Sequence, residues 1–294
     1  MKHLALAFLA AGLLLPLHVQ AAVIGEDDRE PIADSKPELA RGIGFILETG
    51  SAYTCTAFCV ADDVIATSAH CILRRDSKLS PVDLAAIRFH MFDRNTATRD
   101  SNGTMPFRSV RAATNLQTGP GHQTTTATFH GRFSIKKDSP RHFDDWALAK
   151  LETPLCKGRA LTTKPVTQTQ LRTESNAGNL YMIGYHGGRF EEGRIRSADC
   201  ELGRVKLDRF MRAQRQRFAN APDLLLHRCD MEQGASGSPI FMDTEEGPKV
   251  VAMNSGSVSH LIYQLRPGSQ RRQLISRYDA NTAVLARAFS DGID

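Results

Sequence analysis

Short segments with the composition of β-strands recur along the chain from Arg41 onward. They are rich in Ile, Val, Phe, Thr and Tyr and are separated by turn residues such as Gly50-Ser51 and Asp62-Asp63. In the first half they are Gly42 to Thr49, Thr54 to Ala61, Val64 to Ser68, Leu84 to Phe92 and Phe107 to Ala112. In the second half they are Leu180 to Tyr185, Arg204 to Leu207, Leu224 to His227, Pro239 to Met242, Val250 to Met253 and Leu261 to Leu265. Strands spaced this densely predict an all-β fold built on a closed or sandwiched antiparallel sheet.

The length and composition suit this class. With 294 residues, 41% hydrophobic and 23% charged, the chain is an ordinary globular protein of one large or two small domains. The polar segment Glu152 to Pro165 predicts a linker between two halves. Near the end, Asp279 to Phe289 has helical apolar spacing at Val284, Leu285 and Phe289, which predicts a C-terminal helix.

A glycine-rich turn lies within Met231 to Phe241, with the sequence MEQGASGSPIF. It places Ser236 between Gly234 and Gly237. Glycines leave room for a substrate carbonyl, and their backbone N–H groups can converge on a developing oxyanion. Ser236 is therefore a candidate nucleophile, while a glycine-rich surface turn is the alternative on this motif alone.

A serine nucleophile needs a base and a group that orients the base. His70 ends the short apolar run Ile65 to Cys71, and an imidazole can take the hydroxyl proton and return it to the leaving group. Asp145 enters the strand-like run that ends at Leu151, so its carboxylate would be partly buried and able to fix the imidazole tautomer. The neighbouring Asp144 is the competing carboxylate, and we interpret it as a solvent-facing residue at the strand start.

The three stretches TSAHC, DWALAKL and GASGSP resemble the histidine, aspartate and serine boxes of the trypsin-like (chymotrypsin-fold) serine peptidases, in the same chain order. The GxSGSP form is closer to the bacterial V8-like, or glutamyl endopeptidase, branch than to the GDSGGP of animal digestive enzymes. The resemblance extends from Gly42 to about Asn254. It implies two antiparallel β-barrels packed around a catalytic cleft, with a short C-terminal helix.

The resemblance also implies a role for each box. His70 and Asp145 would lie on the first barrel and Ser236 on the second, with the N–H groups of Gly234 and Ser236 forming the oxyanion hole. Relative to small members of the family, Asn95 to Asp144 looks like an insertion of hairpins or surface loops.

The first 22 residues have the pattern of a secretory signal peptide. Lys2 precedes an apolar stretch from Leu4 to Leu17, and the small residues Ala21 and Ala22 mark the cleavage site. An uncleaved membrane anchor is the alternative, which the short apolar core disfavours. The predicted organisation is signal peptide 1–22, mature N-terminal lead or short propeptide 23–41, N-terminal barrel 42–155, and C-terminal barrel with terminal helix 156–294.

All six cysteines follow the signal, which agrees with export to a compartment where disulfides form. By the resemblance, Cys55 pairs with Cys71 and tethers the strand that precedes the catalytic histidine. Cys200 would pair with Cys229 near the serine loop. By elimination, Cys59 pairs with Cys156. No CxxC or HExxH spacing is present, so we expect neither a metal site nor another cofactor.

The formal net charge of +5 is mild. The basic clusters Arg209 to Arg217 and Arg271-Arg272 with Arg277 are interpreted as solvated faces, since a nucleic-acid site needs more charge and stacking aromatics. The histidines within the insertion lack regular ligand spacing, so we expect them on the surface; they are His122, His130 and His142.

The residue before Ser236 bears on activation. In trypsin-like zymogens a newly formed N-terminal ammonium pairs with an aspartate at this position, whereas this chain has Ala235. That ion pair is impossible here. Either the site forms without proteolytic activation, or the N-terminus engages another group, as in the V8-like branch.

Substrate preference is not assigned by the motifs. Asp230 lies six residues before Ser236, where trypsin has the carboxylate that selects Arg or Lys, but the adjacent Cys229 indicates a different loop, and Asp230 could instead bond loop backbone. The segment Asn254-Ser255-Gly256 resembles the strand that pairs with substrate backbone and lines the pocket. V8-like enzymes that cleave after glutamate have a histidine near the position of Asn254. This chain has no such histidine, so the resemblance does not imply a preference for glutamate.

Together these features predict a secreted or periplasmic serine endopeptidase that works through an acyl-enzyme. We expect a monomer acting on protein or peptide substrates, with no nucleic-acid partner and no membrane partner after signal cleavage. One alternative is a secreted esterase using the same triad, which the lack of a strand-GxSxG-helix elbow disfavours. The other is a non-catalytic binding protein on a protease scaffold, which would have no need of all three residues.

Overall fold

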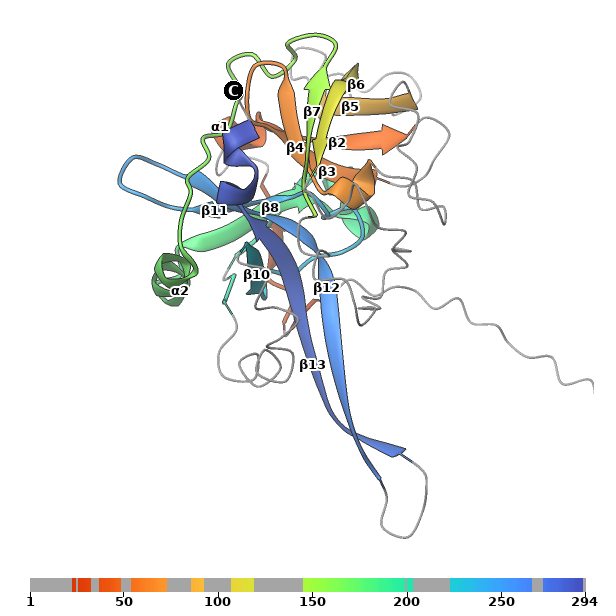
Figure 1. Cartoon of the computed structure of the whole chain (residues 1–294), viewed down its shortest axis with the longest axis vertical. Coiled ribbons are helices and arrows are strands. Elements are labelled where there is room, and N and C mark those ends of the chain that lie inside the picture. Colours follow the sequence, from red (N-terminus) through yellow and green to blue (C-terminus); the bar gives the residue numbers. More distant parts are fainter. Residues whose placement is uncertain are drawn as a thin grey trace, which may run out of the picture.

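The strands of the described residues form two sheets (Figure 1). The computed structural model describes residues 23–24, 26–32, 37–48, 54–72, 86–92, 107–118, 145–198, 200–202, 223–265 and 272–292. The all-β class predicted from the strand pattern is confirmed.

The first sheet is a closed antiparallel barrel with the strand order β2-β3-β4-β7-β6-β5. It closes because β2 pairs with β3 on one side and with β5 on the other. The strands are β2 (Ile43–Glu48), β3 (Thr54–Cys59), β4 (Val64–Thr67), β5 (Ile87–Phe92), β6 (Phe107–Thr118) and β7 (Ala147–Leu151). The predicted base, His70, lies three residues after β4, and the predicted acid, Asp145, lies two residues before β7.

The second sheet has seven strands in the order β1-β9-β8-β11-β12-β13-β10. These are β1 (Arg29–Pro31), β8 (Leu180–Tyr185), β9 (Arg194–Ser197), β10 (Leu224–His227), β11 (Pro239–Met242), β12 (Lys249–Leu265) and β13 (Arg272–Leu285). Strands β9 and β10 lie near opposite edges of this strand order, yet the segments that follow them are in contact. A disulfide joins Cys200 after β9 to Cys229 after β10, and the Arg228 N–H donates to the Glu201 carbonyl at 2.9 Å, so the sheet is rolled. The second barrel is thus a rolled sheet that strand pairing does not close within the described residues.

A shared apolar core fastens the two sheets together. One buried cluster fills the first barrel and another fills the second sheet, while a third contains residues from both. The third cluster includes Phe45, Phe58 and Leu148 from the first barrel and Tyr181, Ile183, Phe241 and Met253 from the second sheet. The relative position of the halves is therefore fixed by the same burial that stabilises each of them.

The helices within the described parts of the chain are short. They are α1 (Pro37–Ala40), α2 (Gln168–Asn176), and the 3-10 turns η1 (Ala69–Cys71), η4 (Gly187–Glu192), η5 (Ala286–Ala288) and η6 (Ser290–Gly292). Helix α2, which the sequence analysis did not predict, begins with a capping box between Thr167 and Gln170. Among the described residues, no helix is long and apolar enough to cross a membrane.

The bounds predicted for the C-terminal helix were wrong. Asp279 to Leu285 belongs to β13, and the helical end is reduced to the 3-10 turns η5 and η6. The strand is buried on both faces from Ala280 to Leu285, so its apolar residues do not alternate and the spacing is ambiguous. Cross-strand bonds to β12 then decide the structure, with pairs from Ala252↔Leu285 to Leu265↔Arg272.

Strands β12 and β13 also form a long hairpin that projects from the body of the molecule (Figure 1). The two strands predicted at Val250 to Met253 and Leu261 to Leu265 are parts of this one strand, β12. The predicted strand Arg204 to Leu207 and most of the predicted insertion, apart from β6, lie outside the described residues.

Phe289 tests the packing of the C-terminal turns. Its side chain is 1% exposed and contacts Phe58 and Trp146, with ring centroids 6.4 and 6.5 Å apart. We expect Phe289→Ala to lower the free energy of unfolding by about 3–5 kcal/mol, because it leaves a cavity between the halves. Denaturant unfolding would measure this, with the exposed Asp291→Asn as control. A loss no larger than that of the control would contradict the packing described here.

Candidate active site

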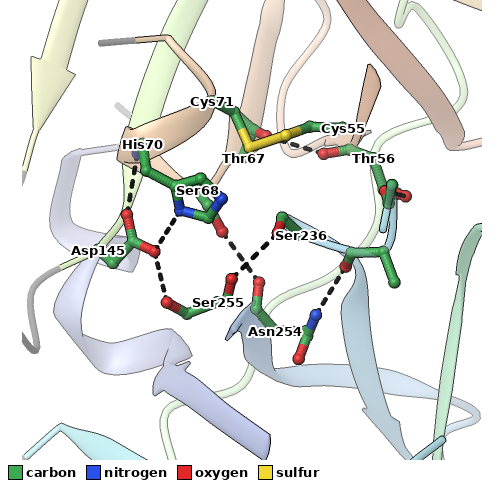
Figure 2. The surroundings of a disulfide bond; sticks show 12 residues. Cys55, Thr56, Thr67, Ser68, His70, Cys71, Asp145, Ser236, Asn254 and Ser255 are labelled. Carbon is green, nitrogen blue, oxygen red and sulfur yellow. Dashed lines mark hydrogen bonds and ion pairs between the residues drawn. A yellow bond between two sulfur atoms is a disulfide. The ribbon is translucent and has the colours of Figure 1, made fainter. Parts of the chain in front are cut away.

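His70 is held in place by its neighbours in η1. This 3-10 turn follows β4 directly, and Cys71 forms a disulfide with Cys55 on β3 (Figure 2). The His70 N–H donates to Asp145 Oδ1 at 3.0 Å, and the ring Nδ1 lies 2.7 Å from Asp145 Oδ2. Asp145 therefore holds both the backbone and the ring of His70.

Asp145 is buried immediately before β7, with 1% of its surface exposed. Its Oδ2 also accepts a hydrogen bond from the hydroxyl of Ser255. An ionised carboxylate can only accept hydrogen bonds, so the proton between the two side chains belongs to His70 Nδ1. This tautomer leaves the opposite ring nitrogen, Nε2, as a base. Asp144, the competing carboxylate, lies outside the described residues.

Ser236 comes from the other sheet, on the turn that leads into β11. Figure 2 shows its side chain on the side of the His70 ring that is away from Asp145. The hydroxyl donates to the Ser255 carbonyl at 3.1 Å. Rotation about the Cα–Cβ bond redirects such a hydroxyl, and hydrogen bonds between catalytic groups often tighten only when substrate is bound.

The turn before Ser236 has a defined peptide orientation. The Ala235 N–H donates to the Glu232 carbonyl at 3.0 Å, and Gly234 has φ +99°, as the third residue of a type II turn requires. The Gln233 carbonyl accepts from the Gly187 N–H at 2.6 Å. Because a trans peptide is planar, the N–H of Gly234 points away from Gly187. This orientation is compatible with the oxyanion donor predicted at Gly234, whose role stays a prediction.

Strand β3 of the first barrel holds the Ser236 loop through Thr56. The Thr56 N–H donates to the carbonyls of Gly234 and Ser236, each at 2.9 Å. The Thr56 hydroxyl donates to the Gly234 carbonyl and accepts from the Tyr185 N–H, also at 2.9 Å. The two sheets thus meet through buried hydrogen bonds at the loop itself.

A sequence model of the family described as "Trypsin-like peptidase domain" matches residues 55–253. The chain belongs to this family. The match covers His70, Asp145 and Ser236. Membership supports a peptidase function with protein or peptide substrates.

Solved structures agree on the fold. A Glu endopeptidase in complex with MPD gives a TM-score of 0.57 at 17% identity, over 92% of this chain and 97% of that one. The secreted serine protease VesC from Vibrio cholerae gives 0.51 at 14% identity, over 90% of this chain and 47% of that one. An inactivated protease paralogue of the scabies mite gives 0.51 at 13% identity, over 88% and 96%. No curated protein matches the sequence.

These likenesses are to chymotrypsin-fold proteases, so the resemblance predicted from the three boxes is confirmed for family and fold. At such identities they establish the fold alone. Because one of these similar structures is an inactivated paralogue, the fold by itself does not decide whether a member is active.

The residues predicted to contact substrate make bonds within the protein. Asp230 is buried, and its two oxygens accept the N–H groups of Ile24 at 2.7 Å and Asp28 at 3.2 Å. Asn254 is buried beneath the serine loop, and its Nδ2 donates to the Ala235 carbonyl at 2.7 Å. Ser255 bonds Asp145 through its side chain, and Gly256 continues β12 opposite Thr282. A direct role of these residues in substrate binding stays a prediction.

Two residues around the site, Thr56 and Arg29, were not identified from the sequence. Thr56 makes the bonds described above, and the buried Arg29 contacts Glu232 in the turn before Ser236. Ser255 was predicted to line the substrate pocket, and its bond to Asp145 was not predicted. A polar residue within an apolar strand, as in TCTAFC, is the available signal for Thr56. Arg29 gives no local signal, because its partners lie in remote parts of the sequence.

The structure brings together one group of potential metal ligands among its described residues: one atom each from Cys55, His70 and Cys71 within 4.8 Å of one another. Both cysteine sulfurs are joined in a disulfide, so neither is a thiolate able to bind a metal.

Two buried histidines near the loop have lowered pKa values. Burial lowers the pKa of His227 to about 4, and burial together with the Arg29 charge lowers the pKa of His186 to about 4. His227 Nε2 lies 3.1 Å from Asn254 Oδ1, and Asn254 donates to the Ala235 carbonyl. The amide oxygen of Asn254 is thus the acceptor, and His227 is neutral with its proton on Nε2.

These histidines predict acid sensitivity. Each histidine stays neutral in the folded protein, whereas in the unfolded chain it binds a proton below about pH 6.5. The free energy of unfolding therefore has its full value above about pH 6.5 and decreases as the pH falls toward 4. Each histidine accounts for a decrease of up to about 3 kcal/mol, from 1.36 kcal/mol per pKa unit. Urea unfolding at pH 7, 5.5 and 4 should show this fall. His227→Gln should lose less on acidification than wild type, and a free energy of unfolding that is constant over the range would contradict both assignments.

Proposed function

We propose that this protein is an exported serine endopeptidase that hydrolyses peptide bonds through Ser236, His70 and Asp145. The observation that carries the proposal is the fixed His70–Asp145 pair. Asp145 accepts both the backbone N–H and the ring Nδ1–H of His70, and Ser236 lies on the other side of the ring (Figure 2). This arrangement suits a base that must present Nε2 to a hydroxyl.

In the first step, His70 Nε2 takes the proton of the Ser236 hydroxyl as the oxygen attacks the peptide carbonyl. The carbonyl oxygen becomes an oxyanion, which the N–H groups of Gly234 and Ser236 stabilise. The buried carboxylate of Asp145 stabilises the imidazolium that forms. The C–N bond then breaks, and His70 returns the proton to the leaving amine.

In the second step, water attacks the ester formed with Ser236. His70 takes a proton from this water, the C–O bond to Ser236 breaks, and His70 returns the proton to the serine oxygen. The peptide leaves with a new carboxyl terminus, and the protein regains its starting protonation state.

Export is supported by the sequence and the disulfides. Residues 1–22 have the signal-peptide pattern, and three disulfides join Cys55 to Cys71, Cys59 to Cys156 and Cys200 to Cys229. These are the pairings expected from the sequence. Disulfides persist in oxidising compartments, so the protein is proposed to act outside the cytoplasm.

Ser236→Ala tests the nucleophile. We expect wild type to react with a fluorophosphonate probe and to cleave casein, whereas Ser236→Ala should not label and should lose roughly a millionfold in turnover, by analogy with another triad enzyme. Ser238→Ala is a matched control on the same loop, because the Oγ of Ser238 is buried and has no hydrogen-bond partner among the described atoms. It should label and cleave like wild type.

Three other results would reject the proposal. Casein cleavage that survives in Ser236→Ala would exclude this nucleophile. Labelling and ester hydrolysis without casein cleavage would favour an esterase. A disulfide-bonded wild-type protein that neither labels nor cleaves would favour a non-catalytic binding protein.

A further inference from the structure

Arg29, on the first strand of the second sheet, is a buried cation with its partners in place. Its side chain is 4% exposed. The guanidinium donates to both oxygens of Asp27 at 2.7 Å, to Glu232 Oε1 at 3.0 Å and to His186 Nδ1 at 3.0 Å. Since a guanidinium can only donate, His186 Nδ1 is the acceptor and the ring is neutral.

Two of these partners lie on the segments that position the turn Glu232 to Ala235, which we name the oxyanion turn. Glu232 is the first residue of the turn, and His186 directly precedes Gly187. The Gly187 N–H in turn bonds the Gln233 carbonyl at 2.6 Å. Arg29 therefore links the two chain segments that this hydrogen bond joins.

These contacts bear on the orientation of the Gln233–Gly234 peptide. In a type I turn the central peptide is reversed relative to a type II turn, since ψ of the second residue and φ of the third both change. The reversal would break the bond from Gly187 and would turn the Gln233 carbonyl toward the site. A carbonyl there would repel an oxyanion instead of stabilising it.

The N-terminal segment is itself bound firmly to the second sheet. Asp230 accepts the N–H groups of Ile24 and Asp28, and Arg189 Nη1 donates to the Arg29 carbonyl at 2.9 Å. Strand β1 pairs with β9. Arg29 is thus held by its backbone on one side while its side chain reaches the turn on the other.

We propose that Arg29 is a positioning residue that keeps the oxyanion turn in its productive orientation, through Glu232 and His186. This inference rests on the proposed function. In trypsin-like zymogens an N-terminal ammonium stabilises the site by pairing with an aspartate at the position of Ala235. Here the internal guanidinium of Arg29 would stabilise the turn instead. It also makes the segment from Asp27 to Pro31 a permanent part of the active fold rather than a removable propeptide.

The electrostatics agree with a strongly coupled group. The hydrogen bonds and charge of Arg29 lower the pKa of Asp27 to about 2, and they also lower the pKa of Glu232. Both carboxylates are therefore ionised at neutral pH, and removal of the guanidinium leaves two like charges close to the turn.

The test compares Arg29→Lys, Arg29→Met, Glu232→Gln and the double variant Arg29→Met/Glu232→Gln. A lysine keeps the charge but lacks the planar guanidinium, so its three N–H donors cannot reproduce the four hydrogen bonds of Arg29, while glutamine keeps the shape of Glu232. For a chromogenic peptide that wild type cleaves, we expect kcat to fall roughly 10- to 100-fold in each, approaching the loss of one oxyanion donor, with KM changed less than about threefold. The double variant should lose no more than Arg29→Met alone.

The control is Glu30→Gln. Glu30 is next to Arg29 on β1, and its exposed side chain forms an ion pair with Arg196 of β9, which the variant removes. It should keep wild-type kcat. Thermal unfolding of every variant separates positioning from folding, since assays run well below each melting temperature compare folded protein only.

The inference is wrong if Arg29→Lys and Glu232→Gln keep kcat, if KM alone rises, or if kcat falls only in proportion to the folded fraction. It is also wrong if removal of residues before Ile32 raises activity, as loss of an inhibitory propeptide would. In all these cases wild type remains active through Ser236, so the proposed function stands. A wild type without Ser236-dependent activity would instead remove the proposed function, and this inference with it.

Discussion

The hydrogen bonds between Thr56 and the Ser236 loop fix the relation between the two sheets at the site. The proposed base and acid belong to the first barrel, and the proposed nucleophile belongs to the second sheet. A small rotation between the halves would therefore separate the groups, although each sheet remained intact. The Thr56 N–H and hydroxyl bond carbonyls of the loop directly, in a buried position where unpaired polar groups are costly. The apolar cluster shared by both sheets stabilises the same arrangement.

This close approach explains one glycine of the motif. A Cβ at Gly237 would lie 2.1 Å from the Thr56 carbonyl oxygen and 2.5 Å from Thr67 Oγ1, and the residue has φ +83°. Any other residue would push the loop off β3. The glycine that follows the proposed nucleophile is thus required by the contact between the sheets as well as by access for substrate.

The sequence was most informative where chemistry and local pattern coincide. The three boxes named His70, Asp145 and Ser236, and runs rich in β-branched and aromatic residues between turn residues located most of the described strands. It was least informative where remote contacts decide. The end of β13 was mistaken for a helix because a strand buried on both faces does not alternate. The role of Arg29 depends on Glu232 and His186, more than 150 residues away, and no local pattern records such a contact.

The same reasoning explains why specificity was not assigned. Asp230 aligns with a pocket carboxylate in trypsin, yet here its oxygens bind the N-terminal backbone. A residue at a matching position can serve the fold instead of the substrate, and only its partners tell which.

The most direct test of the account is a crystal structure of the mature protein with a peptidyl boronic acid, which mimics the tetrahedral intermediate. The account predicts boron bonded to Ser236 Oγ, and one boronate oxygen about 2.7–3.1 Å from the N–H groups of Gly234 and Ser236. His70 should keep its bonds to Asp145. A boronate attached elsewhere, or a Gln233 carbonyl pointing at the boronate oxygen, would contradict the assembled site.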